Sequence, residues 1–214
     1  MISVEVWSDV ACPWCYLGKH RLDTAIDASG EDVRVTWKSF QLDPTIPRGE
    51  RTPHSEALAK KFKAPVEKIQ AMNQRLVDLG AVEGLEYNFD RYMHANTRDA
   101  HRVLHFAQEH GLGNQMKDRL MRGQFTEGAL VDDADALVAM ATDVGLDAAE
   151  VRAVLASDQY DDAVQADIDE AAALGATGVP FFVFDRAFAV SGAQPMETFV
   201  EALRRSADRV TLSS

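Results

Sequence analysis

The first fifth of the chain alternates between strand-like and helix-like patterns. Residues 2–7 (ISVEVW) and 33–40 (VRVTWKSF) are rich in β-branched and aromatic side chains, which predicts two strands. Between them, residues 13–28 place apolar side chains at helical spacing, and Pro13 suits the first position of a helix. This stretch therefore predicts a strand, a helix and a second strand, which together form a βαβ unit.

The end of the chain returns to strand character after a long interval. Residues 180–184 (PFFVF) and 187–192 (AFAVSG) are separated by Asp185 and Arg186, which is the spacing of a hairpin. A last predicted helix follows Pro195. The C-terminal part thus predicts two strands and a helix that complete the same sheet.

The middle of the chain has helical periodicity and almost no strand signal. One apolar stripe (Ile69, Met72, Leu76 and Leu79) stops at Gly80, as expected where a helix ends. Further predicted helical segments are 96–111, 132–145, 147–156 and 158–174. The sequence therefore predicts an α/β protein with a discontinuous sheet domain, residues 1–50 and 176–214, and an all-helical insertion domain, residues 51–175.

Composition and charge exclude some classes of protein. The chain has 214 residues with a formal net charge of −12 and no cluster of basic residues, which disfavours nucleic acid and anionic membranes as partners. No apolar run is long enough for a transmembrane helix. The first ten residues lack the basic and apolar regions of a signal peptide, so we expect a cytoplasmic protein.

The chain contains two cysteines, and they are three residues apart in CPWC. Cys12 precedes Pro13 at the start of the predicted helix, where unpaired N–H groups and the helix dipole favour a negative charge. Cys15 lies on the same side of the helix within bridging reach. We expect Cys12 to be the exposed nucleophile and Cys15 the less exposed resolving thiol of a dithiol/disulfide couple. Trp14 should point outward and shield or recognise a partner.

Three other interpretations of the two cysteines compete with this one. A structural disulfide requires an oxidising compartment. A zinc site requires two more ligands, for which His101 and His105 are candidates because they are four apart on a predicted helix. The simpler interpretation of these histidines is one partly buried and one surface side chain, and we expect no metal. A chance spacing without a role is the third alternative.

The segment TGVPFFVF is the second chemical signal in the sequence. Pro180 at the first position of a strand is ordinary, since its missing N–H is not needed there. Gly178 before it and the dithiol helix in the same domain favour a cis Val179–Pro180 bond. Such a bond would turn the Val179 backbone toward the sulfurs, where it could pair with an extended substrate chain.

Five segments in order resemble the DsbA branch of the thioredoxin superfamily, and its FrnE-like subgroup in particular: WSDVACPWCYLG, WKSFQLDP, NTRDAHRVLHFA, GQFTEG and GVPFFVFDRAFAVSGAQP. The resemblance spans nearly the whole chain. It implies a thioredoxin fold with a helical insertion and thiol–disulfide oxidoreductase activity, with Cys12 as nucleophile, Cys15 as resolving thiol and Pro180 as the cis-proline. Some relatives have Pro-His between the cysteines, so Trp14 implies a less strongly oxidising couple.

The resemblance also implies a buried acid beneath the dithiol for proton transfer. Glu5, on the first predicted strand, and Asp9, in the turn after it, are the candidates. A solvated carboxylate is the simpler interpretation of both, and it fits Asp9 better.

Glutathione-linked relatives offer an alternative function. Kappa-class glutathione transferases and 2-hydroxychromene-2-carboxylate isomerases typically have serine where Cys12 stands, and the intact pair argues against them. FrnE-like proteins have been linked to polyketide biosynthesis, which leaves a small-molecule isomerase open. We expect no cofactor beyond the Cys12–Cys15 pair, glutathione as an optional thiol co-substrate, and protein or small-molecule thiols and disulfides as partners.

Overall fold

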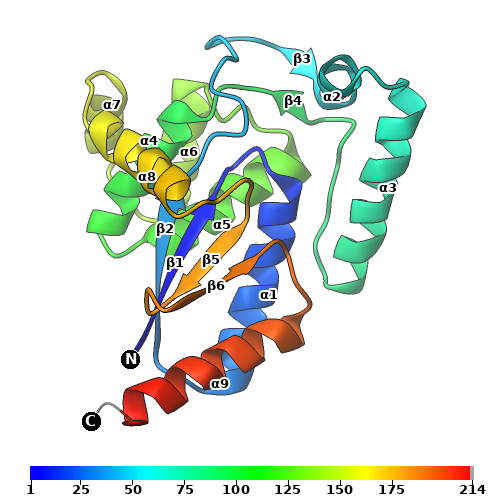
Figure 1. Cartoon of the computed structure of the whole chain (residues 1–214). Helices are drawn as coiled ribbons and strands as arrows, with labels where there is room; N and C mark the ends of the chain where they lie inside the picture. Colours follow the sequence, from blue (N-terminus) through cyan, green and yellow to red (C-terminus); the bar gives the residue numbers. More distant parts are fainter. Residues whose placement is uncertain (213–214) are drawn as a thin grey trace. The chain divides into compact units, whose positions relative to one another are not determined.

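The computed structural model describes residues 1–212 and contains a four-stranded sheet. Its strands are β1 (Ile2–Ser8), β2 (Val33–Ser39), β5 (Phe181–Phe184) and β6 (Phe188–Ser191), in the order β2-β1-β5-β6. β1 and β2 are parallel, as a βαβ unit requires, whereas β1–β5 and β5–β6 are antiparallel. β1 therefore lies inside the sheet, between β2 on one side and β5 on the other (Figure 1).

One face of the sheet packs on α1 (Pro13–Ser29) and α9 (Met196–Leu212), which also contact each other (Figure 1). Side chains alternate between the faces of a strand, and the buried ones on this face are Val4, Val6, Phe182 and Phe184. Phe182 meets Phe199 of α9 edge to face, with 4.7 Å between the ring centroids. Each of these apolar side chains contributes roughly 1.5–3 kcal/mol by leaving water.

The opposite face packs on α8 (Asp161–Ala173). Trp7, Ala171 and Val183 form a buried cluster there. The Trp7 indole N–H donates to the backbone carbonyl of Asp167 over 2.8 Å, and the Asp167 carboxylate accepts from the Ser39 N–H over 2.8 Å. These bonds tie α8 to two adjacent strands and satisfy polar groups that burial would otherwise leave costly.

The hairpin between β5 and β6 turns at Asp185 and Arg186, as the sequence predicts. Both residues have left-handed backbones, with φ of 47° and 52°. Two successive positive φ values define the turn whose twist matches a hairpin. Glycine or asparagine usually occupies such left-handed positions. Here the Asp185 carboxylate accepts the Ser3 N–H over 2.8 Å, which helps to stabilise the turn.

Residues 43–163 form a second compact unit, which is mainly helical. Its elements are β3 (Thr52–Pro53), α2 (His54–Phe62), α3 (Val66–Val82), β4 (Met93–His94), α4 (Arg98–Glu109), α5 (Gly113–Arg122), η1 (Gly123–Glu127), α6 (Ala134–Asp143), α7 (Ala148–Leu155) and the first residues of α8. The predicted helices are present, but the unit is not all-helical, because β3 and β4 pair as a short antiparallel ladder.

The boundaries of the two units differ from those that the sequence predicts. Contacts group residues 1–42 with the chain from Val164 onward, and residues 43–163 with one another. The sequence places the sheet domain at 1–50 and 176–214, and the insertion at 51–175. Most of α8 belongs with the sheet because Asp167 and Ala171 pack on it, and its helical pattern alone could not show this.

Candidate active site

Cys12 occupies the position immediately before α1. Its backbone is extended, with φ −100° and ψ 109°, and its carbonyl accepts the Cys15 N–H over 2.9 Å. The Cys12 N–H donates to the Asp9 carbonyl over 3.1 Å, which closes a tight turn after β1. Pro13 is the first helical residue, where its missing N–H is not needed. The turn after β1 and the start of α1 thus fix the Cys12 backbone on both sides, and with it the position of the side chain.

The two cysteines are free thiols whose side chains are hydrogen-bonded to each other. This hydrogen bond raises the pKa of the Cys12 thiol, and burial, the Cys15 charge and the Asp9 carboxylate act in the same direction. The backbone N–H of Cys15 opposes them and lowers the pKa. The Cys12 pKa is therefore raised, whereas its place at the start of the helix predicts a thiolate. The neighbouring sulfur, the Asp9 carboxylate and burial outweigh the Cys15 backbone N–H.

The peptide bond between Val179 and Pro180 is cis. The Val179 carbonyl oxygen lies 3.6 Å from the Cys12 sulfur and accepts a hydrogen bond from its thiol. The Val179 backbone is therefore directed at Cys12, on the segment that leads into β5.

The prediction that Cys12 is exposed is wrong. Cys12 retains 4% of its accessible surface and Cys15 retains 1%, so both are buried and Cys12 is only slightly less so. Trp14 between them is 40% exposed, in agreement with its expected outward direction. The helix turns Trp14 away from the sulfurs, because residues two apart lie on different faces.

Asp9 is a buried acid, contrary to the solvated carboxylate that its turn position favours. It is 1% exposed, and its carboxylate accepts the Leu42 N–H over 2.8 Å and the Ala11 N–H over 3.3 Å. Its charge acts on the Cys12 thiol. The turn after β1 thus brings together a thiol and a carboxylate.

Glu5, the other candidate acid, forms ion pairs away from the cysteines. Its carboxylate accepts from Arg186 over 2.6 Å, and Arg186 also contacts Glu170 over 2.9 Å. Glu5 lies four residues before Asp9, at a position whose register partner is Val183. The structure therefore places Asp9, and not Glu5, beside Cys12.

The two candidate zinc histidines lie on α4 in the helical unit. His101 is fully buried, whereas His105 is partly buried and stacks on Tyr160 with 6.2 Å between the ring centroids. Within the described part of the chain, no group of three or more histidine, cysteine, aspartate or glutamate side chains could hold a metal ion.

Gly18 is a site neighbour that the sequence-based reasoning overlooked. A Cβ at this position would lie 3.0 Å from Cγ of Pro180. The available signal was a glycine inside a predicted helix, which lowers helix stability and often marks close packing. The reason for a glycine at this position is its close packing against Pro180, which the helical pattern alone does not show.

A sheet in the order β2-β1-β5-β6, with α1 starting at a cysteine pair opposite Pro180, defines a thioredoxin-fold protein. The model of the DSBA-like thioredoxin domain family matches residues 3–204. The chain belongs to this family, and the predicted fold class is confirmed. The FrnE-like subgroup stays a prediction.

Known proteins extend this picture. A probable DsbA oxidoreductase from Streptomyces coelicolor has 45% identity and a TM-score of 0.92, with 97% of this chain and 91% of that chain covered. YwbO of Bacillus subtilis (strain 168), an uncharacterized protein, is 30% identical over 204 residues, which cover 94% of this chain and 96% of YwbO. A 2-hydroxychromene-2-carboxylate isomerase has 15% identity and a TM-score of 0.71, with 99% of each chain covered, which shows a shared fold alone.

Proposed function

We propose that this protein is a thiol–disulfide oxidoreductase in which Cys12 and Cys15 form the redox couple. The observation that carries the proposal is the contact between the two thiols, with Cys12 at the start of α1 and facing the Val179 carbonyl. Family membership supports the same activity. Partners are protein or small-molecule thiols and disulfides, in the cytoplasm, with glutathione as an optional co-substrate.

In the reductive direction, the Cys12 thiolate attacks one sulfur of a partner disulfide. A bond forms between Cys12 and that sulfur, the partner's S–S bond breaks, and the other sulfur leaves as a thiolate. The Cys15 thiolate then attacks the Cys12 sulfur and releases the second partner thiol. The partner gains two electrons and the protein becomes the Cys12–Cys15 disulfide, and the reverse sequence oxidises a dithiol.

Val179 is proposed to hold the partner chain next to Cys12. Its carbonyl accepts the Cys12 thiol hydrogen bond in this structure, and it becomes available when that thiol reacts. An extended partner could then pair with the Val179 backbone as an added strand. Trp14, exposed beside the pair, would contact the partner's apolar side chains.

A trapping experiment separates the proposal from its main alternative. The Cys15→Ser variant, mixed with a disulfide-linked peptide, should accumulate a mixed disulfide at Cys12, because the resolving thiol is missing. The Cys12→Ser variant is the matched control and should trap nothing. Because the chain has two cysteines, mass spectrometry assigns every adduct unambiguously.

The alternative is a glutathione-linked isomerase on the same fold. Such an enzyme relies on the thiol of glutathione and should convert 2-hydroxychromene-2-carboxylate equally well after both cysteines are replaced by serine. Retained isomerase activity in that double variant, together with no adduct in Cys15→Ser, would overturn the oxidoreductase proposal.

A further inference from the structure

Gly18 faces the segment that carries Pro180 from one turn beyond Cys15. A Cβ built on Gly18 would lie 3.0 Å from Pro180 Cγ, 3.2 Å from Phe182 Cζ and 3.5 Å from Ala193 Cβ. The first two separations are shorter than ordinary van der Waals contact between carbon atoms. Glycine at this position therefore allows a closeness between α1 and the Pro180 segment that a side chain would prevent.

The neighbours of Gly18 have little room to move aside. Phe182 is fully buried, and its ring packs edge to face on Phe199 with 4.7 Å between centroids. The Pro180 carbonyl accepts the Gly192 N–H over 2.8 Å. Close-packed interiors transmit such small displacements instead of absorbing them. An added methyl group would thus move α1 and the Pro180 segment apart.

Arg21 makes a second tie between α1 and the same region. Its Nη1 donates to the Ala193 carbonyl over 2.7 Å, one residue beyond Gly192. Gly192 in turn holds the Pro180 carbonyl. Residues 18 and 21 are three apart and lie on one face of α1, so the close contact and the hydrogen bond act together.

We propose that Gly18 is a positioning residue of the dithiol site, assisted by Arg21, and that it sets the separation between the Cys12 sulfur and the Val179 carbonyl. This inference rests on the proposed function. The separation of 3.6 Å belongs to the thiol in its protonated form, which donates to the carbonyl. A carbonyl acceptor favours the thiol over the thiolate. Moving the two apart removes the carbonyl's share of this preference and makes Cys12 easier to ionise, while the Cys15 hydrogen bond, burial, the Cys15 charge and the Asp9 charge continue to raise the Cys12 pKa.

The test is the pH dependence of alkylation at Cys12 in wild type and in Gly18→Ala. Reduced protein is treated with iodoacetamide, and fragment mass spectrometry assigns the label to Cys12. We expect the midpoint of the Gly18→Ala profile to fall by roughly half a pH unit. Below that midpoint, the rate should rise about twofold, because a larger thiolate fraction outweighs its lower nucleophilicity.

Folding stability provides a second, independent readout for the same variant. In a helix without a clash, replacing glycine by alanine is stabilising. We expect Gly18→Ala to unfold at a lower urea concentration than wild type, because the Cβ contacts outweigh helix propensity. A variant that is more stable, or one that is destabilised with an unchanged Cys12 profile, would overturn the positioning role.

Gly178→Ala is the matched control for the methyl group. It lies in the same segment as Pro180, but a Cβ there would meet nothing within 4 Å beyond its two chain neighbours. We expect its alkylation profile to coincide with that of wild type. An equal shift in both variants would show that the Cβ contact at Gly18 is not the cause.

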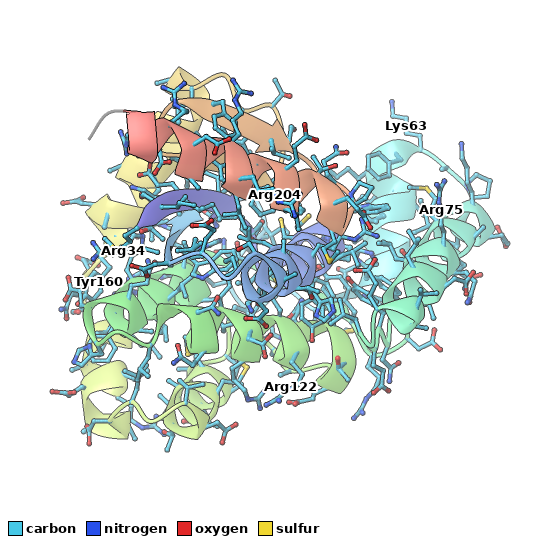
Figure 2. All side chains as sticks on the ribbon, turned by 90° about the horizontal axis from the view of Figure 1, so that it is seen from below. Arg34, Lys63, Arg75, Arg122, Tyr160 and Arg204 are labelled. Atoms are coloured by element: carbon cyan, nitrogen blue, oxygen red, sulfur yellow. The ribbon has the colours of Figure 1, made fainter. Side chains whose placement is uncertain are left out.

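Arg21→Ala tests the second tie, with Arg204→Ala as its control. Arg204 is exposed on α9 (Figure 2). Arg21→Ala should shift the Cys12 profile in the same direction as Gly18→Ala but less, and Arg204→Ala should not shift it. No shift in Arg21→Ala would restrict the positioning role to Gly18 and contradict the contribution of Arg21.

These readouts are independent of the partner. If the proposed function fails, wild-type protein forms no Cys12–Cys15 disulfide, whatever the alkylation profiles show. If the positioning inference fails, wild-type exchange is normal and Gly18→Ala leaves the Cys12 profile unchanged.

Discussion

Cys12 in the sheet unit and His54 in the helical unit are both buried titratable groups, with exposures of 4% and 3%. In both groups the pKa shift favours the uncharged form. The Cys15 hydrogen bond and burial raise the pKa of Cys12, and burial lowers the pKa of His54 to about 3. Their surroundings differ. Cys12 faces a second thiol and a backbone carbonyl, whereas His54 stacks on Tyr92 with 4.2 Å between centroids.

The difference shows that burial and a shifted pKa do not by themselves mark an active site. The His54 ring also packs near Phe89 and His94, so its neighbours are mainly aromatic rings, and its role is to fill a core. The Cys12 thiol has neighbours that can exchange bonds or protons with it. Reactivity therefore depends on which groups surround the buried one.

The largest effect should come from acid acting on His54. Its pKa of about 3 lies below the ordinary 6.5, because burial and then His94 disfavour the charge, with Asn73 opposing them. The unfolded chain binds the proton first, so stability is fully present above about pH 6.5 and falls as the pH decreases toward 3. The loss is about 1.4 kcal/mol per pH unit, or roughly 2–3 kcal/mol between pH 6.5 and 4.5.

The His54→Phe variant sharpens this prediction because it keeps the stacked ring but cannot bind a proton. Urea unfolding at pH 6.5 and 4.5 should show a smaller drop in unfolding free energy than in wild type. His105→Phe, a partly buried ring in the same unit, is the control and should keep the wild-type drop. Equal drops in wild type and His54→Phe would contradict the assigned role.

A smaller effect is expected from Asp9, whose negative charge lies near Cys12 and has no counterpart described around His54. Asp9→Asn keeps an oxygen for the Leu42 N–H but removes the negative charge that raises the pKa of Cys12. We expect the pH midpoint of Cys12 alkylation to fall by about half a unit. Glu5→Gln is the matched control and should leave the midpoint unchanged, since Glu5 pairs with Arg186. Equal profiles for wild type and Asp9→Asn would remove Asp9 from the site.

Local patterns predicted the elements around the site well. Apolar spacing and Pro13 place α1, and the β-branched runs place β1 and β2, because these signals act within a few residues. The Asp185–Arg186 turn was equally readable. Chain order alone also brings the Pro180 segment into the domain that holds Cys12.

Burial and long-range contact were not readable from the sequence. The turn position of Asp9 predicts a solvated side chain, because nothing local shows that Leu42, which lies three residues beyond the end of β2, donates its N–H to the Asp9 carboxylate. The start of the helix predicts a thiolate at Cys12, but the opposing sulfur and carboxylate become visible only in three dimensions. The sequence places Asp167 in the insertion for the same reason, since its partners on β1 and β2 are distant in sequence.

Within the described residues, no helix combines the length and apolar composition that crossing a bilayer requires. The chain has two cysteines, so any disulfide within one chain joins Cys12 and Cys15.

The most direct test of the account is the equilibrium between this pair and glutathione. The protein is incubated over a range of reduced-to-oxidised ratios, free thiols are alkylated, and mass spectrometry measures the fraction with an intramolecular disulfide. We predict a single two-electron transition at a potential more negative than the roughly −120 mV of DsbA, since a raised Cys12 pKa disfavours the reduced thiolate that makes such couples oxidising. A protein that forms no Cys12–Cys15 disulfide at any ratio would contradict the central claim.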